Sequence, residues 1–286
     1  MFFLVDAFTD IPFKGNPAGV CIVNNYPDDQ TLQKIARYYN WSEISFLKKL
    51  GDSEFQIRWF SPLDEAPLCG HATIAAAHIL FSKELVAGNV VNFKHGNDDI
   101  AVERTNLGIT ISFPAKPISS CKKAPFSVKD IIGVENYIEI VKDELLYIIV
   151  LETAEDVENA SPNFEAIKNI DCRAIAITAK GTGEFDFSSR YFAPKVGIFE
   201  DPVCGSMHCR LACYWRSILG KTSFNAYQAS KRTGVLQVKL ENDIVRITGR
   251  AVTVCEITQS NFESAFCPSS SVGHRERNHL ATGKAC

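Results

Sequence analysis

Alternating apolar and polar residues predict several short strands along the chain. In FQIRW (55–59) every second residue is apolar, which is the two-residue period of a strand with one buried face. The same alternation marks 108–113, 235–240, 244–249 and 250–257, and the polar residues between the second and third of these favour a hairpin. The apolar start of the chain, MFFLV, also indicates a strand. The pattern predicts a protein rich in β-sheet.

Two dense runs of apolar residues predict helices that are buried on most sides. One run follows Cys69-Gly70-His71 and the other follows Cys204-Gly205-Ser206. In both runs apolar residues recur too closely for a helix that buries only one face. The second run stops at Gly220, and glycine commonly ends helices. Cys-Gly and a polar residue thus stand at the start of two predicted core helices.

The chain contains this plan twice. RWFSP (58–62) is matched by RYFAP (190–194) 132 residues later, and the two Cys-Gly pairs are 135 residues apart. Each copy gives a strand that ends at a proline, which cannot donate to a sheet ladder, and then a Cys-Gly helix. The repeat predicts an α+β fold with two similar halves, in which strands curl around one central helix.

Composition suggests where these halves begin and end. The segment 114–126 is rich in proline, serine and lysine and predicts a linker. We therefore expect an N-terminal half at 1–115 and a C-terminal half at 126–257, and the last strand could return to the first half. Residues 127–170 mix helical and strand signals. Residues 258–286 are polar and lack a period, which is typical of an appended tail that is disordered or loosely docked.

Charge and composition narrow the classes of function. A net charge of −3 gives no electrostatic reason to expect nucleic acid or an anionic membrane as a partner. No apolar run approaches the ~18 residues of a membrane span, and the N-terminus lacks the basic region and cleavage site of a signal peptide. We expect a cytoplasmic protein. Its ten cysteines should then be reduced, because a chain of 286 residues can bury a core without disulfides.

Several motifs, in order along the chain, resemble the PhzF-like phenazine-biosynthesis family. They are DAFTDIPFKGNPAGV (6–20), SEISFL (42–47), RWFSP (58–62), CGHAT (69–73), EDPVCGS (200–206) and GRAVTV (249–254). The resemblance covers about residues 1–257 and implies the duplicated fold of diaminopimelate epimerase, with an active site in the cleft between two similar halves. It also implies an isomerase that needs no cofactor or metal, acts on a small carboxylate-bearing metabolite and forms a homodimer.

Glu43 and His71 match the family residues that handle the proton. A glutamate after a serine is most often a surface or helix-capping residue. Glu43, however, stands among apolar residues, where a carboxyl can give and retrieve a proton, and it resembles the family's acid/base glutamate. His71 resembles the histidine that contacts substrate and assists proton movement. A helix dipole disfavours a charged imidazole at a helix start, so we expect a neutral His71.

Further residues match family positions that contact the substrate. By this resemblance Asp201 and Ser206 in EDPVCGS hold polar groups of the substrate, and Asn16 in GNPAGV contacts it. We count Asp201 among the catalytic candidates, although Asp-Pro is also an ordinary signal for a helix start. Gly70 and Gly205 should leave room for a carboxylate to approach free backbone N–H groups at the two helix starts.

Cys69 and Cys204 depart from many PhzF-like proteins, which lack one or both cysteines. Diaminopimelate epimerases carry both, as a pair that acts on opposite faces of a carbon. Thiols at helix N-termini commonly have lowered pKa values, so the sequence predicts reactive thiolates here. Both residues could equally be small apolar side chains at helix starts. Glu43 favours isomerisation by a single proton shuttle, whereas the two thiols favour epimerisation, and the chain has the residues for both.

Two other interpretations have weaker support. Cys69, His71, Cys204 and His208 could be drawn as a zinc tetrad, but neither pair has the spacing of a zinc knuckle, and we expect no metal. The chain could also be a non-catalytic binding or regulatory protein on the same scaffold. Such a protein would not exchange any C–H of a bound small molecule with solvent.

Overall fold

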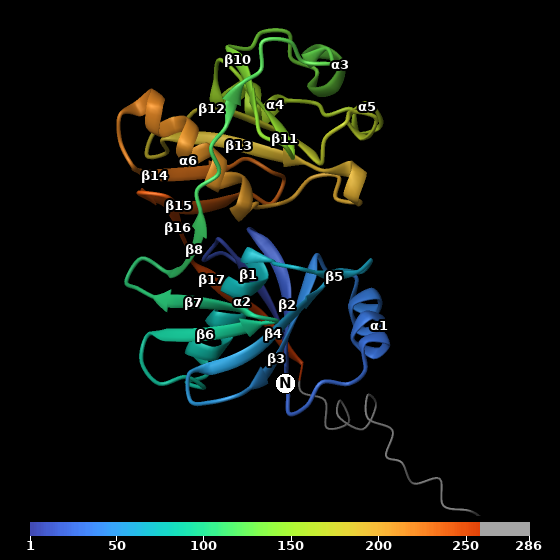
Figure 1. Ribbon diagram of the computed structural model, residues 1–286, viewed down its shortest axis with the longest axis vertical. Helices are drawn as coiled ribbons and strands as arrows, with labels where there is room; N and C mark the ends of the chain where they lie inside the picture. Colours follow the sequence, from blue (N-terminus) through green and yellow to red (C-terminus); the bar gives the residue numbers. More distant parts are fainter. Residues whose placement is uncertain (258–286) are drawn as a thin grey trace, which may run out of the picture.

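One continuous sheet forms the frame of the molecule. The computed structural model describes residues 1–257, so the predicted tail at 258–286 lies outside the described residues. The sheet has 17 strands and curls into two lobes, drawn one above the other in Figure 1. Helix α2 (Gly70–Ser82) belongs to the lower lobe and α6 (Gly205–Leu219) to the upper lobe. The predicted α+β class is confirmed.

The N-terminal lobe takes its elements from the first part of the chain and from the last described strand. They are β1 (Phe2–Ala7), β2 (Asn16–Val23), α1 (Asp29–Tyr39), β3 (Glu43–Lys49), β4 (Glu54–Phe60), β5 (Glu65–Ala66), α2, β6 (Val90–His95), β7 (Asp98–Arg104), β8 (Ile109–Pro114) and β17 (Ala251–Ile257).

The C-terminal lobe takes its elements from the remainder of the chain. They are β9 (Ser119–Ser120), α3 (Val128–Ile132), β10 (Glu139–Lys142), β11 (Leu146–Val150), α4 (Ala154–Asn159), α5 (Phe164–Lys168), β12 (Ala174–Lys180), β13 (Phe187–Phe192), the 3-10 turn η1 (Pro194–Val196), α6, β14 (Ser223–Gln228), β15 (Gly234–Glu241) and β16 (Ile244–Gly249).

The two lobes repeat the same strand order. One series runs β17, β1, β2, β3, β4, β6, β7, β8, and the other runs β9, β10, β11, β12, β13, β14, β15, β16. Parallel pairs fall at the same places, because β2–β3 matches β11–β12 and β4–β6 matches β13–β14. The central helices also match, since α2 precedes β6 and α6 precedes β14. The duplication expected from the sequence is therefore present in the topology.

Strand pairing between distant parts of the chain ties the lobes together. β8 pairs with β16, which joins the two curled sheets. β17 returns to the N-terminal lobe and pairs with β1, where Phe2 faces Ile257. The segment predicted as a linker is not wholly irregular, because β9 lies within it and pairs with β10. The boundaries 1–115 and 126–257 stay a prediction.

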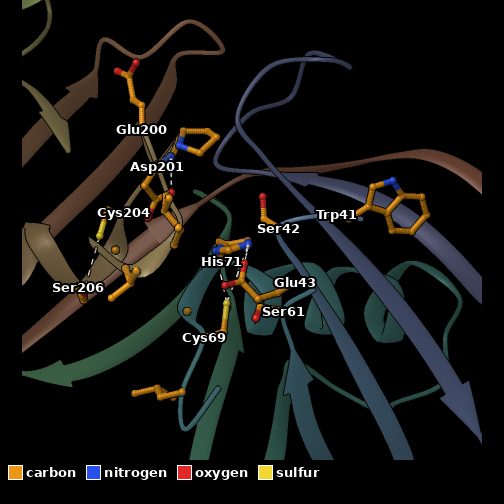
Figure 2. A pocket seen from close by; sticks show the side chains of 18 of the residues that line it. Trp41, Ser42, Glu43, Ser61, Cys69, His71, Glu200, Asp201, Cys204 and Ser206 are labelled. Atoms are coloured by element: carbon orange, nitrogen blue, oxygen red, sulfur yellow. Dashed lines mark hydrogen bonds and ion pairs between the residues drawn. The ribbon is translucent and has the colours of Figure 1, made fainter. Parts of the chain in front are cut away.

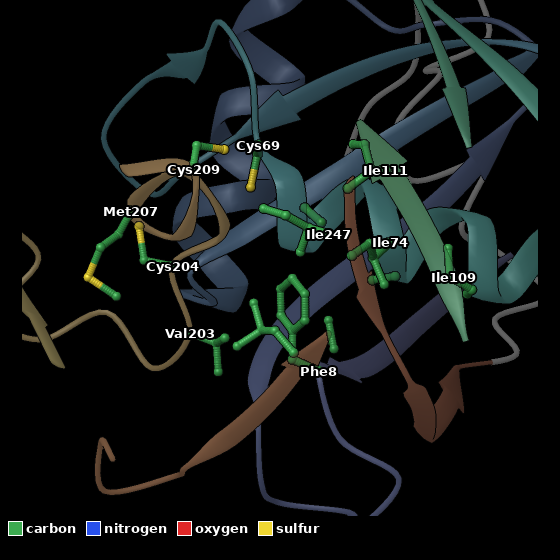
Figure 3. Close-up of a cluster of buried hydrophobic side chains, with 14 of the residues drawn as sticks. Phe8, Cys69, Ile74, Ile109, Ile111, Val203, Cys204, Met207, Cys209 and Ile247 are labelled. Atoms are coloured by element: carbon green, nitrogen blue, oxygen red, sulfur yellow. The ribbon is translucent and has the colours of Figure 1, made fainter. Parts of the chain in front are cut away.

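One hydrophobic core extends through both lobes and continues across the junction at the cleft. Near the junction it includes Phe8, Cys69, Cys204, Met207 and Ile247 (Figure 3). Helix α2 is buried from its first turn through Ala77, as its dense apolar pattern predicts. Smaller cores lie under α1 on one lobe and under α3, α4 and α5 on the other. The sheet is therefore covered on both faces in parts of each lobe, and α2 and α6 are held firmly where they open toward the cleft.

The described cysteines and helices bear on two further expectations. Every cysteine in residues 1–257 is a free thiol in this structure, and the reduced state in the cell stays a prediction. None of the helices in this part of the chain has the length and apolar character that a membrane crossing requires.

Candidate active site

A cavity of about 950 Å³ lies in the cleft between the lobes. Its walls come from the loops before β3 and after β4 and β13, and from the starts of α2 and α6 (Figure 2). All of the predicted site residues except Asn16 line it: Glu43, Cys69, Gly70, His71, Asp201, Cys204, Gly205 and Ser206. The structure thus brings residues from both halves of the chain to one cavity.

The two Cys-Gly motifs place a thiol at the start of each central helix. Cys69 is the N-cap residue of α2 and Cys204 is that of α6. Each cysteine is 7% exposed. A side chain at Gly70 would put a Cβ atom 3.2 Å from Phe113 Cζ, so the glycine keeps this entrance to the backbone N–H groups open.

Glu43, His71 and Cys69 form one cluster in the N-terminal lobe (Figure 2). Glu43 opens β3 and His71 lies in the first turn of α2. Glu43 Oε2 lies 3.1 Å from His71 Nε2, and Cys69 Sγ lies 3.5 Å from His71 Nδ1. The Ser45 hydroxyl donates to the Ala72 carbonyl at 2.9 Å and fixes β3 against α2. The imidazole therefore lies between a carboxyl and a thiol.

The protonation of this cluster differs from the expectation based on the sequence. Burial would lower the pKa of His71, but the acidic groups of Cys69 and Glu43 raise it well above its ordinary value. Burial, with the nearby charge of Glu43, raises the pKa of the Cys69 thiol. The predicted direction of the pKa shift was therefore wrong for both His71 and the Cys69 thiol. Glu43 and Cys69 act on the imidazole, and burial acts on the thiol, in the direction opposite to the one expected from a helix start.

Asp201 approaches this cluster from the C-terminal lobe (Figure 2). Burial raises its pKa, while the charges of His71 and Glu43 act on it in opposite directions. Asn16 Nδ2 donates to Asp201 Oδ1 at 2.7 Å and to the Val203 carbonyl at 3.0 Å. Asn16 is 0% exposed. The structure thus places Asn16 behind Asp201, where it orients that carboxyl and has no direct access to the cavity.

Cys204 and Ser206 face the cavity from the start of α6. Cys204 Sγ lies 3.4 Å from Ser206 Oγ. Burial and the charge of Asp201 raise the pKa of Cys204 far above its ordinary value. The predicted lowering of the Cys204 pKa was therefore also wrong, because burial acts in the opposite direction.

The zinc tetrad drawn from the sequence is not assembled. His208 Nδ1 donates to the Cys204 carbonyl at 2.7 Å, and Thr73 Oγ1 makes the matching bond to the Cys69 carbonyl at 2.6 Å. Both side chains thus secure a helix start. Among residues 1–257 the potential metal ligands that do lie together are Glu43, Cys69 and His71, with ligand atoms within 4.8 Å of one another.

Two residues that shape the cleft were not predicted. Gln228 Oε1 accepts from the Cys204 N–H at 2.8 Å, and its Nε2 donates to the Asp201 carbonyl at 2.6 Å. Arg210 lines the cavity and donates to Asp143 Oδ2 at 2.6 Å. No motif surrounds Gln228. Arg210 could have been noticed as one of two charges, with Arg216, within the dense apolar run of α6.

The fold is that of the diaminopimelate epimerase-like superfamily, and the chain is an enzyme of the isomerase class within it. The family model described as "Phenazine biosynthesis-like protein" matches residues 5–257. The chain therefore belongs to the phenazine biosynthesis-like family, and the resemblance drawn from its motifs is confirmed.

Individual relatives agree with this assignment. An uncharacterized isomerase of Halalkalibacterium halodurans is 39% identical over 254 residues, which are 88% of this chain and 95% of the relative. The crystal structure of a PhzF-family phenazine biosynthesis protein from Enterococcus faecalis matches with a TM-score of 0.84 at 35% identity, covering 89% of this chain and 96% of that chain. A probable proline racemase from Agrobacterium radiobacter, 11% identical with a TM-score of 0.54 over 92% and 94% of the two chains, shares the fold.

Proposed function

We propose that this chain is a cofactor-independent isomerase that moves a proton between two positions of a small, carboxylate-bearing metabolite. The proposal rests on the 3.1 Å contact between Glu43 Oε2 and His71 Nε2 inside the cleft. A carboxyl that contacts an imidazole inside a cleft is positioned to exchange a proton with a substrate carbon. A cavity of about 950 Å³ suits a small metabolite.

In the proposed reaction Glu43 takes a proton from a carbon next to an electron-withdrawing group, and the electron pair of that C–H bond delocalises into the substrate. The same carboxyl then returns the proton to a second carbon, so that atoms and electrons balance within the substrate. Asp201, which Asn16 orients from behind, accepts a hydrogen bond from a polar group of the substrate. Ser206 and the free N–H groups at the starts of α2 and α6 bind the substrate carboxylate.

Epimerisation by two thiols is the second candidate. The observation in its favour is that Cys69 and Cys204 both stand at helix starts and line the same cavity. Both thiols, however, keep their protons more firmly than an ordinary cysteine, because burial raises their pKa values. We therefore favour Glu43 as the group that moves the proton.

The test is exchange of a substrate C–H with D₂O. Small carboxylates are incubated with the protein in D₂O, and deuterium uptake is followed by mass spectrometry and NMR. The wild type should label at least one of them, and Glu43→Gln should slow labelling by about 10²–10⁴-fold, the usual contribution of a general acid/base. The matched control is Glu54→Gln, which changes a half-exposed carboxylate at the start of β4 that pairs with Lys94 of β6. This variant should label at the wild-type rate.

Two results would contradict the proposal. Unchanged labelling by Glu43→Gln would remove the carboxylate from the mechanism. Tight binding of a carboxylate by the wild type, with no deuterium uptake, would support a non-catalytic binding protein instead. The homodimer and the cytoplasmic location remain predictions, and sedimentation of the full chain would decide the first.

A further inference from the structure

The duplicated strands β4 and β13 carry an arginine at the same position, and each arginine forms an ion pair with a glutamate. Arg58 Nε and Nη2 donate to the two carboxylate oxygens of Glu65, both at 2.7 Å. Arg190 Nε and Nη2 donate to those of Glu200 at 2.7 and 3.1 Å. Two parallel bonds fix the orientation of a carboxylate as well as its position. Glu65 of β5 and the loop residue Glu200 are thus each held to the strand that carries their arginine.

Both glutamates lie at the same place relative to the cysteines of the cleft. Glu65 stands four residues before Cys69, and Glu200 stands four residues before Cys204. The arginines are offset by 132 residues, but the glutamates share the offset of 135 that separates the cysteines. The additional residues of the second copy therefore fall between its arginine and its glutamate, in the loop that contains η1. The spacing from glutamate to cysteine was kept while the loop before it changed length.

Each guanidinium also contacts an aromatic ring and a neighbouring helix, in addition to its glutamate. The guanidinium of Arg58 lies over the Phe60 ring at 5.0 Å, and that of Arg190 lies over the Phe192 ring at 5.0 Å. Arg58 also donates to Asp29, the first residue of α1, at 2.8 Å. Arg190 donates to carbonyl groups at the end of α4, the shortest bond being 2.7 Å to Ala160. A neighbouring helix thus holds each guanidinium in place.

We propose that Arg58–Glu65 and Arg190–Glu200 form a duplicated clamp that positions the two Cys-Gly helix starts at the cleft. In the second copy Glu200 is followed directly by Asp201, so Arg190 and Glu200 are positioning residues for Asp201 and Cys204. Arg58 and Glu65 hold the segment that leads to Cys69 and His71. The catalytic consequence rests on the proposed function, whereas the positioning itself is tested without a substrate.

The two copies differ in burial, which sets the size of the expected effects. The side chains of Arg190 and Glu200 are 8% and 14% exposed, against 19% and 34% for Arg58 and Glu65. Water screens the N-terminal pair more strongly than the C-terminal pair. Breaking the C-terminal clamp should therefore loosen its helix start more than breaking the N-terminal one.

The experiment measures how fast each thiol reacts with iodoacetamide in the folded protein. Labelled peptides are quantified by mass spectrometry, and fragmentation separates Cys204 from Cys209. Glu200→Gln should speed labelling of Cys204 by about tenfold and leave Cys69 within about twofold of the wild type. Glu65→Gln should do the reverse with a smaller increase. Each variant is the control for the other, and Cys21, which is 0% exposed, reports global unfolding.

Further variants keep the test decisive. Arg190→Lys retains the charge but cannot form two parallel bonds, so it should label at Cys204 as fast as Arg190→Gln. If these two variants at a buried residue do not fold, Glu200→Gln carries the test alone. Unchanged labelling of Cys204 in Glu200→Gln would overturn the proposal. Equal acceleration at Cys69, Cys204 and Cys21 would also overturn it, since the pair would then support the whole fold and not one helix start.

Discussion

Asn16 donates a 2.7 Å hydrogen bond to Asp201, and so joins the first lobe to the second at the cleft. The two residues are far apart in the sequence, and Asn16 is fully buried beneath the carboxyl that it contacts. This contact orients an acidic group toward the Glu43–His71 cluster. The alignment of the two halves of the site thus depends in part on one amide.

Asn16→Ala should therefore weaken both the fold and the reaction. Loss of a buried hydrogen bond to an acidic group lowers the free energy of unfolding by about 1–3 kcal/mol, to be measured by urea denaturation. Deuterium exchange should fall as well, because Asp201 loses its fixed orientation. Asn225→Ala is the matched control, since its amide donates to the Glu184 carbonyl at 3.3 Å outside the cleft. An equal loss of exchange in both variants would contradict this role of Asn16.

Replacing Cys204 distinguishes the two proposed mechanisms. If Glu43 moves the proton, Cys204→Ala should keep deuterium exchange within about tenfold of the wild type, because the thiol contributes only shape to the cavity. A two-thiol mechanism instead requires exchange from one face of the carbon to disappear. Stereochemical analysis of the labelled product makes this measurement. Loss of exchange from one face of the carbon in a folded Cys204→Ala protein would favour epimerisation.

The raised pKa of His71 gives stability a definite dependence on pH. The folded protein holds this proton more tightly than the unfolded chain, whose histidines titrate near about 6.5. The stabilisation is fully present below about pH 6.5 and is lost as the pH rises through the folded value. The stability advantage of the wild type over His71→Gln should therefore shrink on the alkaline side in pH-dependent urea unfolding. An advantage that grows with pH would show that the imidazole is neutral.

His208 should produce the opposite dependence. Burial lowers the pKa of His208 to about 4, below the value of about 6.5 in the unfolded chain. The unfolded chain binds the proton more readily, so the free energy of unfolding is unaffected above about pH 6.5 and falls by up to about 3 kcal/mol toward pH 4. In His208→Gln this part of the slope should be absent. The same acid slope in both proteins would assign it to other groups.

Much of the fold followed from local patterns. The alternation at 55–59 and 244–249 corresponds to β4 and β16, and both Cys-Gly motifs begin the predicted central helices. The pairing of β9 with β10 could not be predicted, because two serines carry no pattern and their strand exists only through its partner. The mixed signals at 127–170 arise since short helices and strands alternate there within a few residues.

Motifs predicted most of the residues that meet in the cleft, but not the direction of their pKa shifts. Motifs placed Glu43 and His71 among the candidates, and the structure sets them in contact. The sequence shows that a thiol stands at a helix start, but it does not show how deeply packing buries that start. Burial decides the pKa of Cys69 and Cys204, and it could only be known once both lobes were assembled. The catalytic roles themselves stay predictions.

The pairing of β17 with β1 has a consequence for the order in which the protein is made. β1 leaves the ribosome before the other described strands, yet one of its edges stays open until residues 251–257 have been synthesised. The N-terminal lobe must therefore wait for nearly the whole chain before its sheet is complete, and the exposed edge of β1 is available for wrong pairing during that time. A nascent chain that stalls before β17 should be the species that most needs a chaperone.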